Sequence, residues 1–134
     1  MSILIMQSCV NNSDQENENI LHDGSRIQKE LIGTWKFWGR FSIERNNWIP
    51  ADPDQKFIYI FNSNRTFSYF DEASGTILSG DFDIIHATGK TNPYLLLRSK
   101  SNGEILSKKI LIISLDNEFI SIFEHTNEDR YQRQ

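Results

Sequence analysis

Apolar and polar side chains alternate along most of the chain after residue 33. In the first such stretch one side holds Trp35, Phe37, Gly39, Phe41 and Ile43, and the other side is mostly polar. Alternation over this length is typical of a half-buried β-strand. The glycine at position 39 predicts a bend or bulge in mid-strand, as the curvature of a small barrel requires.

Seven further segments have strand character and are separated by turn-forming residues. They are 56–61, 66–70, 76–85, 94–98, 105–115, 118–124 and 130–133. Both sides of 56–61 are apolar, so its inward side stays undetermined, and a bulge is expected near Lys108–Lys109. Eight short strands with turns every ~8–12 residues predict an all-β up-and-down antiparallel barrel or a sandwich. We expect the barrel, because closing the sheet removes its exposed edges.

Residues 46–55 are predicted to form a loop. Pro50 and Pro53 cannot sit in a paired central strand. Trp48 and Ile49, the apolar residues of this loop, are expected to fold over the barrel mouth. Before the first strand, a short N-terminal helix is predicted that closes the narrow end of the barrel. Asp23 or Ser25 can cap it, and Ile27 and Leu31 lie one turn apart on it.

Length and charge restrict the classes of protein that remain. The 134 residues fit one domain. The formal net charge is −4, and Asp14, Glu16 and Glu18 all lie in the polar leader. The rest of the chain is nearly neutral, so nucleic acid is not an expected partner. No stretch approaches the ~20 apolar residues of a membrane span.

The first nine residues resemble the end of a bacterial lipoprotein signal peptide. Met6 and Ser8 stand at the −3 and −1 positions before Cys9, the residue that would be lipidated. The apolar core is shortened and no Lys or Arg precedes it, which a start assigned too far downstream would explain. The alternative is a disordered N-terminus with an incidental cysteine. The expected organisation is a truncated signal peptide at 1–9, a disordered tether at 10–25 and a barrel domain at 26–134.

The start of the first strand, Gly33-Thr34-Trp35, resembles the first motif of the lipocalin family. In that family an arginine from the last strand packs over the tryptophan and closes the barrel base. The resemblance assigns this structural role to Gly33, Trp35 and Arg133, with Arg130 in reserve. The turn between Phe61 and Phe67 is similar to a hairpin of bacterial lipocalin-like lipoproteins. Intracellular fatty-acid-binding proteins also begin with Gly-Thr-Trp-Lys, but they need a helical lid where 46–55 carries two prolines.

No group of residues predicts catalysis, so the chain is not expected to be an enzyme. His22, His86 and His125 lack metal-ligand spacing, and no metal or other cofactor is expected. Asp81 and Asp83 lie two apart on one strand, which favours a solvated outer face over an acid–base pair.

The predicted function is binding of a small apolar or amphipathic ligand by a membrane-tethered, lipocalin-like barrel. Trp48, Tyr59 and Tyr69 are the candidate ligand-binding residues at its mouth. The alternative is a cell-envelope lipoprotein with a filled barrel that binds a protein or a glycan through Trp38, Trp48 and Ile49. In either case we expect a monomer, anchored through Cys9 to the outer membrane of a bacterial envelope and facing the periplasm or the cell surface.

Overall fold

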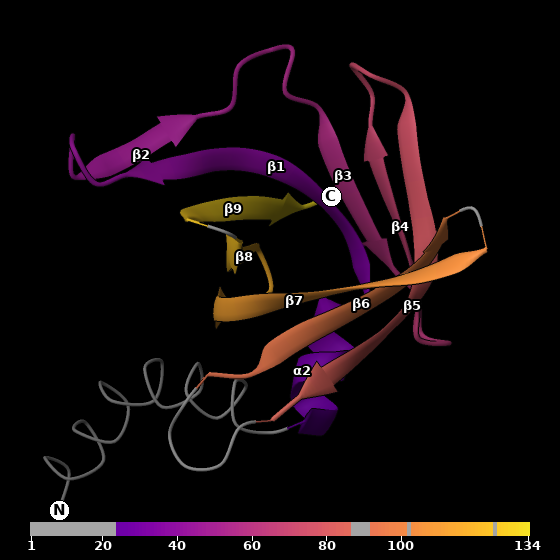
Figure 1. The fold of residues 1–134 in the computed structure, drawn as a ribbon. Coiled ribbons are helices and arrows are strands. Elements are labelled where there is room, and N and C mark those ends of the chain that lie inside the picture. The colour runs from indigo at the N-terminus through magenta and orange to yellow at the C-terminus, as the bar shows by residue number, and fades with distance from the viewer. Residues whose placement is uncertain (1–23, 87–91, 102, 125) are drawn as a thin grey trace, which may run out of the picture.

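A computed structural model describes residues 24–86, 92–101, 103–124 and 126–134 of the chain. Figure 1 shows one antiparallel sheet that curls into a barrel, with a short helix at one end. The helix is α2 (Gly24–Leu31), and it confirms the predicted N-terminal helix. The expected signal peptide at 1–9, its Cys9 and most of the expected tether lie outside the described residues.

Nine strands form the sheet. They are β1 (Gly33–Ser42), β2 (Asn47–Pro50), β3 (Phe57–Phe61), β4 (Thr66–Asp71), β5 (Thr76–Ile85), β6 (Tyr94–Ser101), β7 (Glu104–Leu115), β8 (Phe119–Glu124) and β9 (Asn127–Arg133). From β3 to β9 each strand pairs with the next, and β1 pairs with both β3 and β9. These eight strands therefore close into the predicted antiparallel up-and-down barrel, and β2 lies outside the closed circle.

Strand β2 corrects the prediction of a loop over 46–55. Residues 47–50 pair with the end of β1, and the N–H of Ala51 donates to the carbonyl of Trp38 at 2.9 Å. Pro50 is tolerated because β2 is an edge strand and Pro50 is its last residue. The β1–β2 hairpin projects beyond β9 to one side of the barrel (Figure 1).

The bend expected at Gly39 is confirmed, with Trp38 as the extra residue. The register between β1 and β9 shifts between Phe37 and Gly39. A one-residue shift exchanges the two faces of a strand. Arg40 accordingly pairs with the buried Asp129, and Phe41 moves to the opposite side from Phe37. The single apolar face expected from Trp35 to Ile43 is therefore interrupted at the bulge.

The bulge predicted near Lys108–Lys109 is misplaced. Both lysines pair with β6 in unbroken register, and the shift lies between Ile112 and Ser114, on the side that pairs with β8. The two adjacent lysines do not break the alternation, because Lys108 lines the barrel interior and Lys109 is exposed.

The narrow end of the barrel is densely packed. Ile27 and Leu31 of α2 are fully buried, together with Trp35 of β1. The inward side of β3, left open by the sequence, is formed by Phe57, Tyr59 and Phe61; the last two are 6% and 3% exposed. At this end aromatic and aliphatic side chains fill the interior.

The opposite end is wider because the strands separate there. Pairing of β5 with β6 stops at Gly80 and Ser99, although β5 continues back to Thr76. A Cβ atom on Gly80 would lie 1.8 Å from the carbonyl oxygen of Arg98, so only glycine permits this close approach. Beyond this point the β4–β5 and β6–β7 hairpin tips point in different directions (Figure 1).

Candidate ligand-binding cavity

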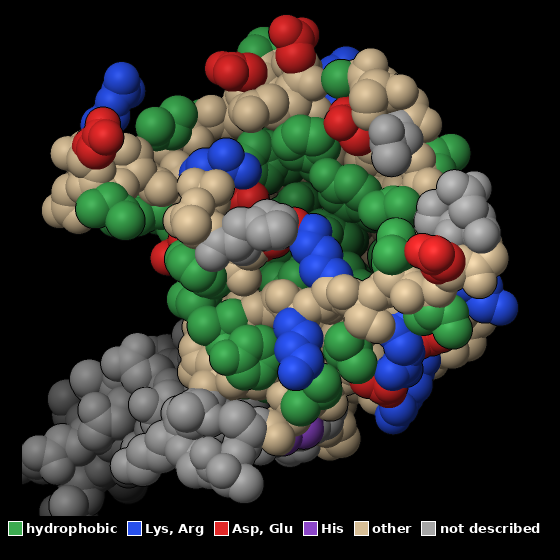
Figure 2. Space-filling model, viewed as in Figure 1, with side chains coloured by type: hydrophobic (Ala, Val, Ile, Leu, Met, Phe, Trp, Pro, Cys, Tyr) green, Lys and Arg blue, Asp and Glu red, His purple; other side chains and the backbone are tan. Residues whose placement is uncertain are grey.

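A cavity of about 200 Å³ lies at the wide end of the barrel. Figure 2 shows the hollow with hydrophobic side chains over its walls and floor. The lining residues come from β3 to β8, and they are Tyr59, Phe67, Tyr69, Leu78, Leu97, Ser99, Leu106, Ser107, Lys108 and Glu124. Leu78 and Leu106 form part of an exposed apolar rim, at 40% and 50% exposure.

The floor of the cavity is sealed by the packed half of the barrel. The interior space below it measures only about 10 Å³ and is surrounded by Trp35, Phe61, Leu95 and other core residues. A void of this size holds at most one water molecule. A ligand in the cavity is therefore confined to the upper half of the barrel, above Tyr59.

Three tyrosines cluster inside the barrel. The ring of Tyr59 lies 4.6 Å from that of Tyr69 and 5.3 Å from that of Tyr131, centroid to centroid. Burial raises the pKa of Tyr59 and of Tyr131, and neighbouring tyrosines and Asp129 add to the effect. Burial, with Asp71 next, raises the pKa of Tyr69 to about 12. All three hydroxyls therefore stay protonated at neutral pH and can both donate and accept a hydrogen bond.

The hydroxyls of Tyr59 and Tyr69 have no hydrogen-bond partner within the part of the chain that the structure describes. That part also contains no enclosed side-chain oxygen that lacks a partner. The hydroxyl oxygens must therefore reach open space. Both side chains line the cavity, and Tyr59 also borders the small space below it. Polar hydrogen-bonding capacity remains available there for a bound molecule.

Lys108 and Glu124 place a pair of opposite charges in the cavity wall. The ammonium of Lys108 forms an ion pair with a carboxylate oxygen of Glu124. The side chain of Lys108 is 42% exposed and that of Glu124 is 18% exposed. Loss of solvent around Lys108 lowers the pKa of its ammonium. The pair was not predicted from the sequence, because the expected bulge at Lys108–Lys109 hid the inward position of Lys108.

A second, more open hollow lies beside the mouth. Its volume is about 420 Å³, and its walls include Arg40, Phe41, Ile43 and Ile49 of the β1–β2 hairpin. At its edge the guanidinium of Arg40 donates to both carboxylate oxygens of Asp129, at 2.7 and 3.2 Å. The hydrogen bond to Asp129 raises the pKa of Arg40, so its guanidinium stays charged.

Trp48 lies apart from the two tyrosines with which it was predicted to bind a ligand. Its ring packs on the outside of the barrel against Trp38 and Phe41, with centroids 6.1 and 5.4 Å away. The guanidinium of Arg130 lies 4.1 Å from the centroid of the Trp48 ring. Tyr59 and Tyr69 line the cavity, whereas Trp48 fastens the hairpin to the outer wall. Ile49, on the other side of β2, is 41% exposed.

The residues assigned to barrel closure meet at the opposite end from the cavity. The guanidinium of Arg133 lies 4.3 Å from the centroid of the Trp35 ring and donates to the carbonyls of Glu30, Ile32 and Asn117. The indole N–H of Trp35 donates to the carbonyl of Leu31 at 2.8 Å. Arg133 therefore occupies the base, and the reserve candidate Arg130 belongs to the outer cluster with Trp48.

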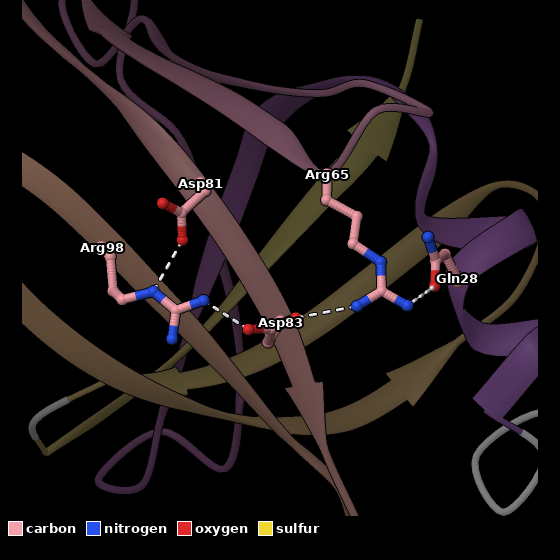
Figure 3. A network of polar contacts seen from close by, with 5 residues as sticks. All are labelled: Gln28, Arg65, Asp81, Asp83 and Arg98. Atoms are coloured by element: carbon pink, nitrogen blue, oxygen red, sulfur yellow. Dashed lines mark hydrogen bonds and ion pairs between the residues drawn. The ribbon is translucent and has the colours of Figure 1, made fainter.

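Asp81 and Asp83 lie on the outside of the barrel in a network of ion pairs (Figure 3). Arg98 bridges the two carboxylates, and Arg65 links Asp83 to Gln28 of α2. The hydrogen bond from Arg98 is the main cause that lowers the pKa of Asp83. The network ties the helix to the β3–β4 turn, β5 and β6, and none of its residues lines the cavity.

Two further features bear on function. His86 is exposed, and the described residues contain no group of three or more His, Cys, Asp or Glu side chains that could hold a metal ion. The other two histidines, His22 and His125, lie outside the described residues. Within the same described part, no helix combines the length and the apolar character needed to cross a bilayer.

Comparison with known proteins identifies the architecture. No protein-family model matches the sequence, and no curated protein matches it either. Among solved structures, the chain is similar to a lipocalin-like protein from Bacteroides uniformis, with 11% sequence identity and a TM-score of 0.55. The similarity covers 78% of this chain and 99% of the other. With its closed eight-stranded antiparallel barrel and preceding helix, the chain has the lipocalin-like fold.

Proposed function

We propose that the protein binds one small apolar or amphipathic molecule in the cavity at the wide end of its barrel, without catalysing a reaction. The observation that carries the proposal is the cavity of about 200 Å³. Apolar cavities of roughly 150 Å³ in protein interiors bind benzene. A ligand of about ten non-hydrogen atoms therefore fits the space.

The arrangement of the walls supports binding over simple imperfect packing. The lower half of the same barrel is filled apart from a space of about 10 Å³, so side chains pack closely where the strands are close. The upper half stays open and has an apolar rim that a ligand can cross. The alternative of a filled barrel that acts through its surface has less support, because the barrel is not filled.

The test is to occupy the cavity with a protein side chain. Leu106, on the rim, and Leu97, on the wall, are suitable positions for Trp. Naphthalene binding should be measured by titration calorimetry for the wild type, Leu97→Trp and Leu106→Trp. We expect micromolar to submillimolar binding by the wild type and its loss in both variants. Leu96→Trp is the matched control, since Leu96 faces away from the cavity on the same strand.

Two results would count against the proposal. One is an absence of naphthalene binding by the folded wild type. The other is binding that survives in both folded cavity variants. Loss of binding in Leu106→Trp cannot be attributed to misfolding. Leu106 is half exposed, so a larger side chain is accommodated there at little cost in stability.

We further propose, from the sequence alone, that Cys9 is lipidated and tethers the barrel to a bacterial envelope membrane. Several acyl chains anchor a protein firmly where a single chain does not. When the protein is expressed behind a complete signal peptide, Cys9→Ser should move it from the membrane fraction to the soluble fraction. Unchanged fractionation would reject the tether and leave the ligand-binding proposal intact.

A further inference from the structure

The charges that border the cavity are already neutralised. Lys108 is paired with Glu124 in the wall, and Arg40 is paired with Asp129 near the mouth. Among the described lining residues no cation is left over to balance an incoming anion. The electrostatic surroundings of a bound ligand are therefore neutral in sum, although they are polar at one side.

A carboxylate ligand would bind this cavity poorly for two reasons. It would lose part of its hydration on entering an apolar space, and an unpaired buried charge is costly. To pair with Lys108 it would also have to displace Glu124 from its ion pair with that ammonium. Both costs are absent for a ligand that carries no charge.

An uncharged polar group, in contrast, finds partners that are ready. Tyr59 and Tyr69 line the cavity, their hydroxyls have no partner in the described chain, and Tyr59 is 6% exposed. Each can donate to an oxygen and accept from a hydroxyl. The rings of Tyr59, Tyr69 and Phe67 provide flat apolar surfaces beside them.

We propose that the cavity selects compact, uncharged ligands with one hydrogen-bonding group, such as aromatic alcohols, over carboxylates of the same size. The polar group of the ligand meets the hydroxyls of Tyr59 and Tyr69, and its apolar body lies against Phe67 and Leu97. This inference rests on the proposed binding function and adds the chemical class of the ligand. It also assigns the Lys108–Glu124 pair a role in specificity, namely exclusion of anions.

Three probes with the same ring system test the selection: naphthalene, 2-naphthol and naphthalene-2-carboxylate, titrated by calorimetry at neutral pH. We expect 2-naphthol to bind up to about tenfold more tightly than naphthalene, the worth of one good hydrogen bond. The carboxylate should bind more weakly than either. A carboxylate that binds as tightly as 2-naphthol would overturn the inference. Equal binding of naphthalene and 2-naphthol would also overturn it, but would leave the proposed function standing; no binding of any probe would refute the function itself.

Variants of the two tyrosines test whether their hydroxyls cause the preference for 2-naphthol. Tyr59→Phe and Tyr69→Phe remove only a hydroxyl, and together they should bring the affinity for 2-naphthol down to that for naphthalene. The matched control is Tyr94→Phe, since Tyr94 is 38% exposed and is not among the residues that line the cavity. A preference that persists in the double variant would show that the tyrosine hydroxyls do not recognise the ligand.

Removal of the negative charge of Glu124 tests the exclusion of anions. Glu124→Gln removes the carboxylate partner of Lys108 and should raise the affinity for naphthalene-2-carboxylate, relative to that for naphthalene, by about tenfold. Glu104→Gln, an exposed change at the tip of the same β7 strand, is the control for the lost negative charge. Carboxylate binding that is the same in Glu124→Gln and Glu104→Gln would contradict the role given to the pair.

Discussion

Arg133 joins three parts of the chain at the barrel base. Its guanidinium covers Trp35 and donates to backbone carbonyls on either side of it, including those of Ile32 and Asn117 at 2.8 Å. Arg133→Gln loses the cation over the ring and leaves carbonyl groups without donors, so we expect unfolding to become easier by about 2–4 kcal/mol. Urea denaturation measures this loss. Arg45→Gln, on the exposed β1–β2 turn, should change stability by less than about 0.5 kcal/mol; equal effects of the two changes would refute the closing role.

At the scale of one residue, the resemblance to the lipocalin motif assigned Trp35 and Arg133 to barrel closure, and strand order explains why the two residues meet. Trp35 begins the first strand and Arg133 ends the last, so closure of the barrel must bring them to the same end. Trp48 could not be placed in this way, because its position depends on the bulge at Trp38. The bulge turns Phe41 and its partner Trp48 to the outer face. The alternation of apolar and polar residues does not predict this exchange of faces.

The β1–β2 hairpin is an element that we expect to open independently of the barrel. It projects past β9, and its outer face is held by Trp48 against Trp38, Phe41 and Arg130. Trp48→Ala removes these contacts but leaves the eight barrel strands paired. Hydrogen exchange should therefore speed up for the amides that join β1 to β2, by about tenfold or more, with little change in β5 to β8. Ile49→Ala, on the opposite face of β2, is the control; faster exchange throughout the barrel in Trp48→Ala would contradict local opening.

At the scale of elements, the alternation of apolar and polar residues predicted the barrel strands and the helix, because each has one buried face. It missed β2, since a four-residue edge strand that ends in proline has neither the length nor the composition of a typical strand.

The cavity lining was predicted only in part. Tyr59 and Tyr69 were predicted as candidate ligand-binding residues at the mouth, whereas Lys108 and Glu124 required the actual register of β7 and β8. Whether a barrel of this size is filled or hollow depends on where its strands separate, and the pairing of β5 with β6 ends at the close contact of Gly80 with Arg98.

For the whole molecule, the tyrosine cluster sets a limit to stability at high pH. In the unfolded chain a tyrosine ionises near its ordinary pKa of 10.0, whereas burial keeps Tyr59 protonated to higher pH in the folded barrel. Unfolding above about pH 10 therefore releases a proton from Tyr59, so a rise in pH favours the unfolded state. Below about pH 9 neither state ionises and this contribution to stability is constant. The same sign applies to Tyr69 and Tyr131, whose pKa values are also raised.

Comparison of Tyr59→Phe with the wild type isolates this contribution from the other groups that titrate at high pH. We expect the free energies of unfolding, from urea denaturation, to differ by a constant amount between about pH 7 and 9, since the variant lacks only the hydroxyl. Above about pH 10 the wild type should lose stability more steeply than the variant, because only the wild type can release the Tyr59 proton on unfolding. Parallel curves up to about pH 11 would show that the Tyr59 hydroxyl ionises as easily in the barrel as in water. That result would remove the neutral hydroxyl on which the selection of uncharged ligands depends at alkaline pH.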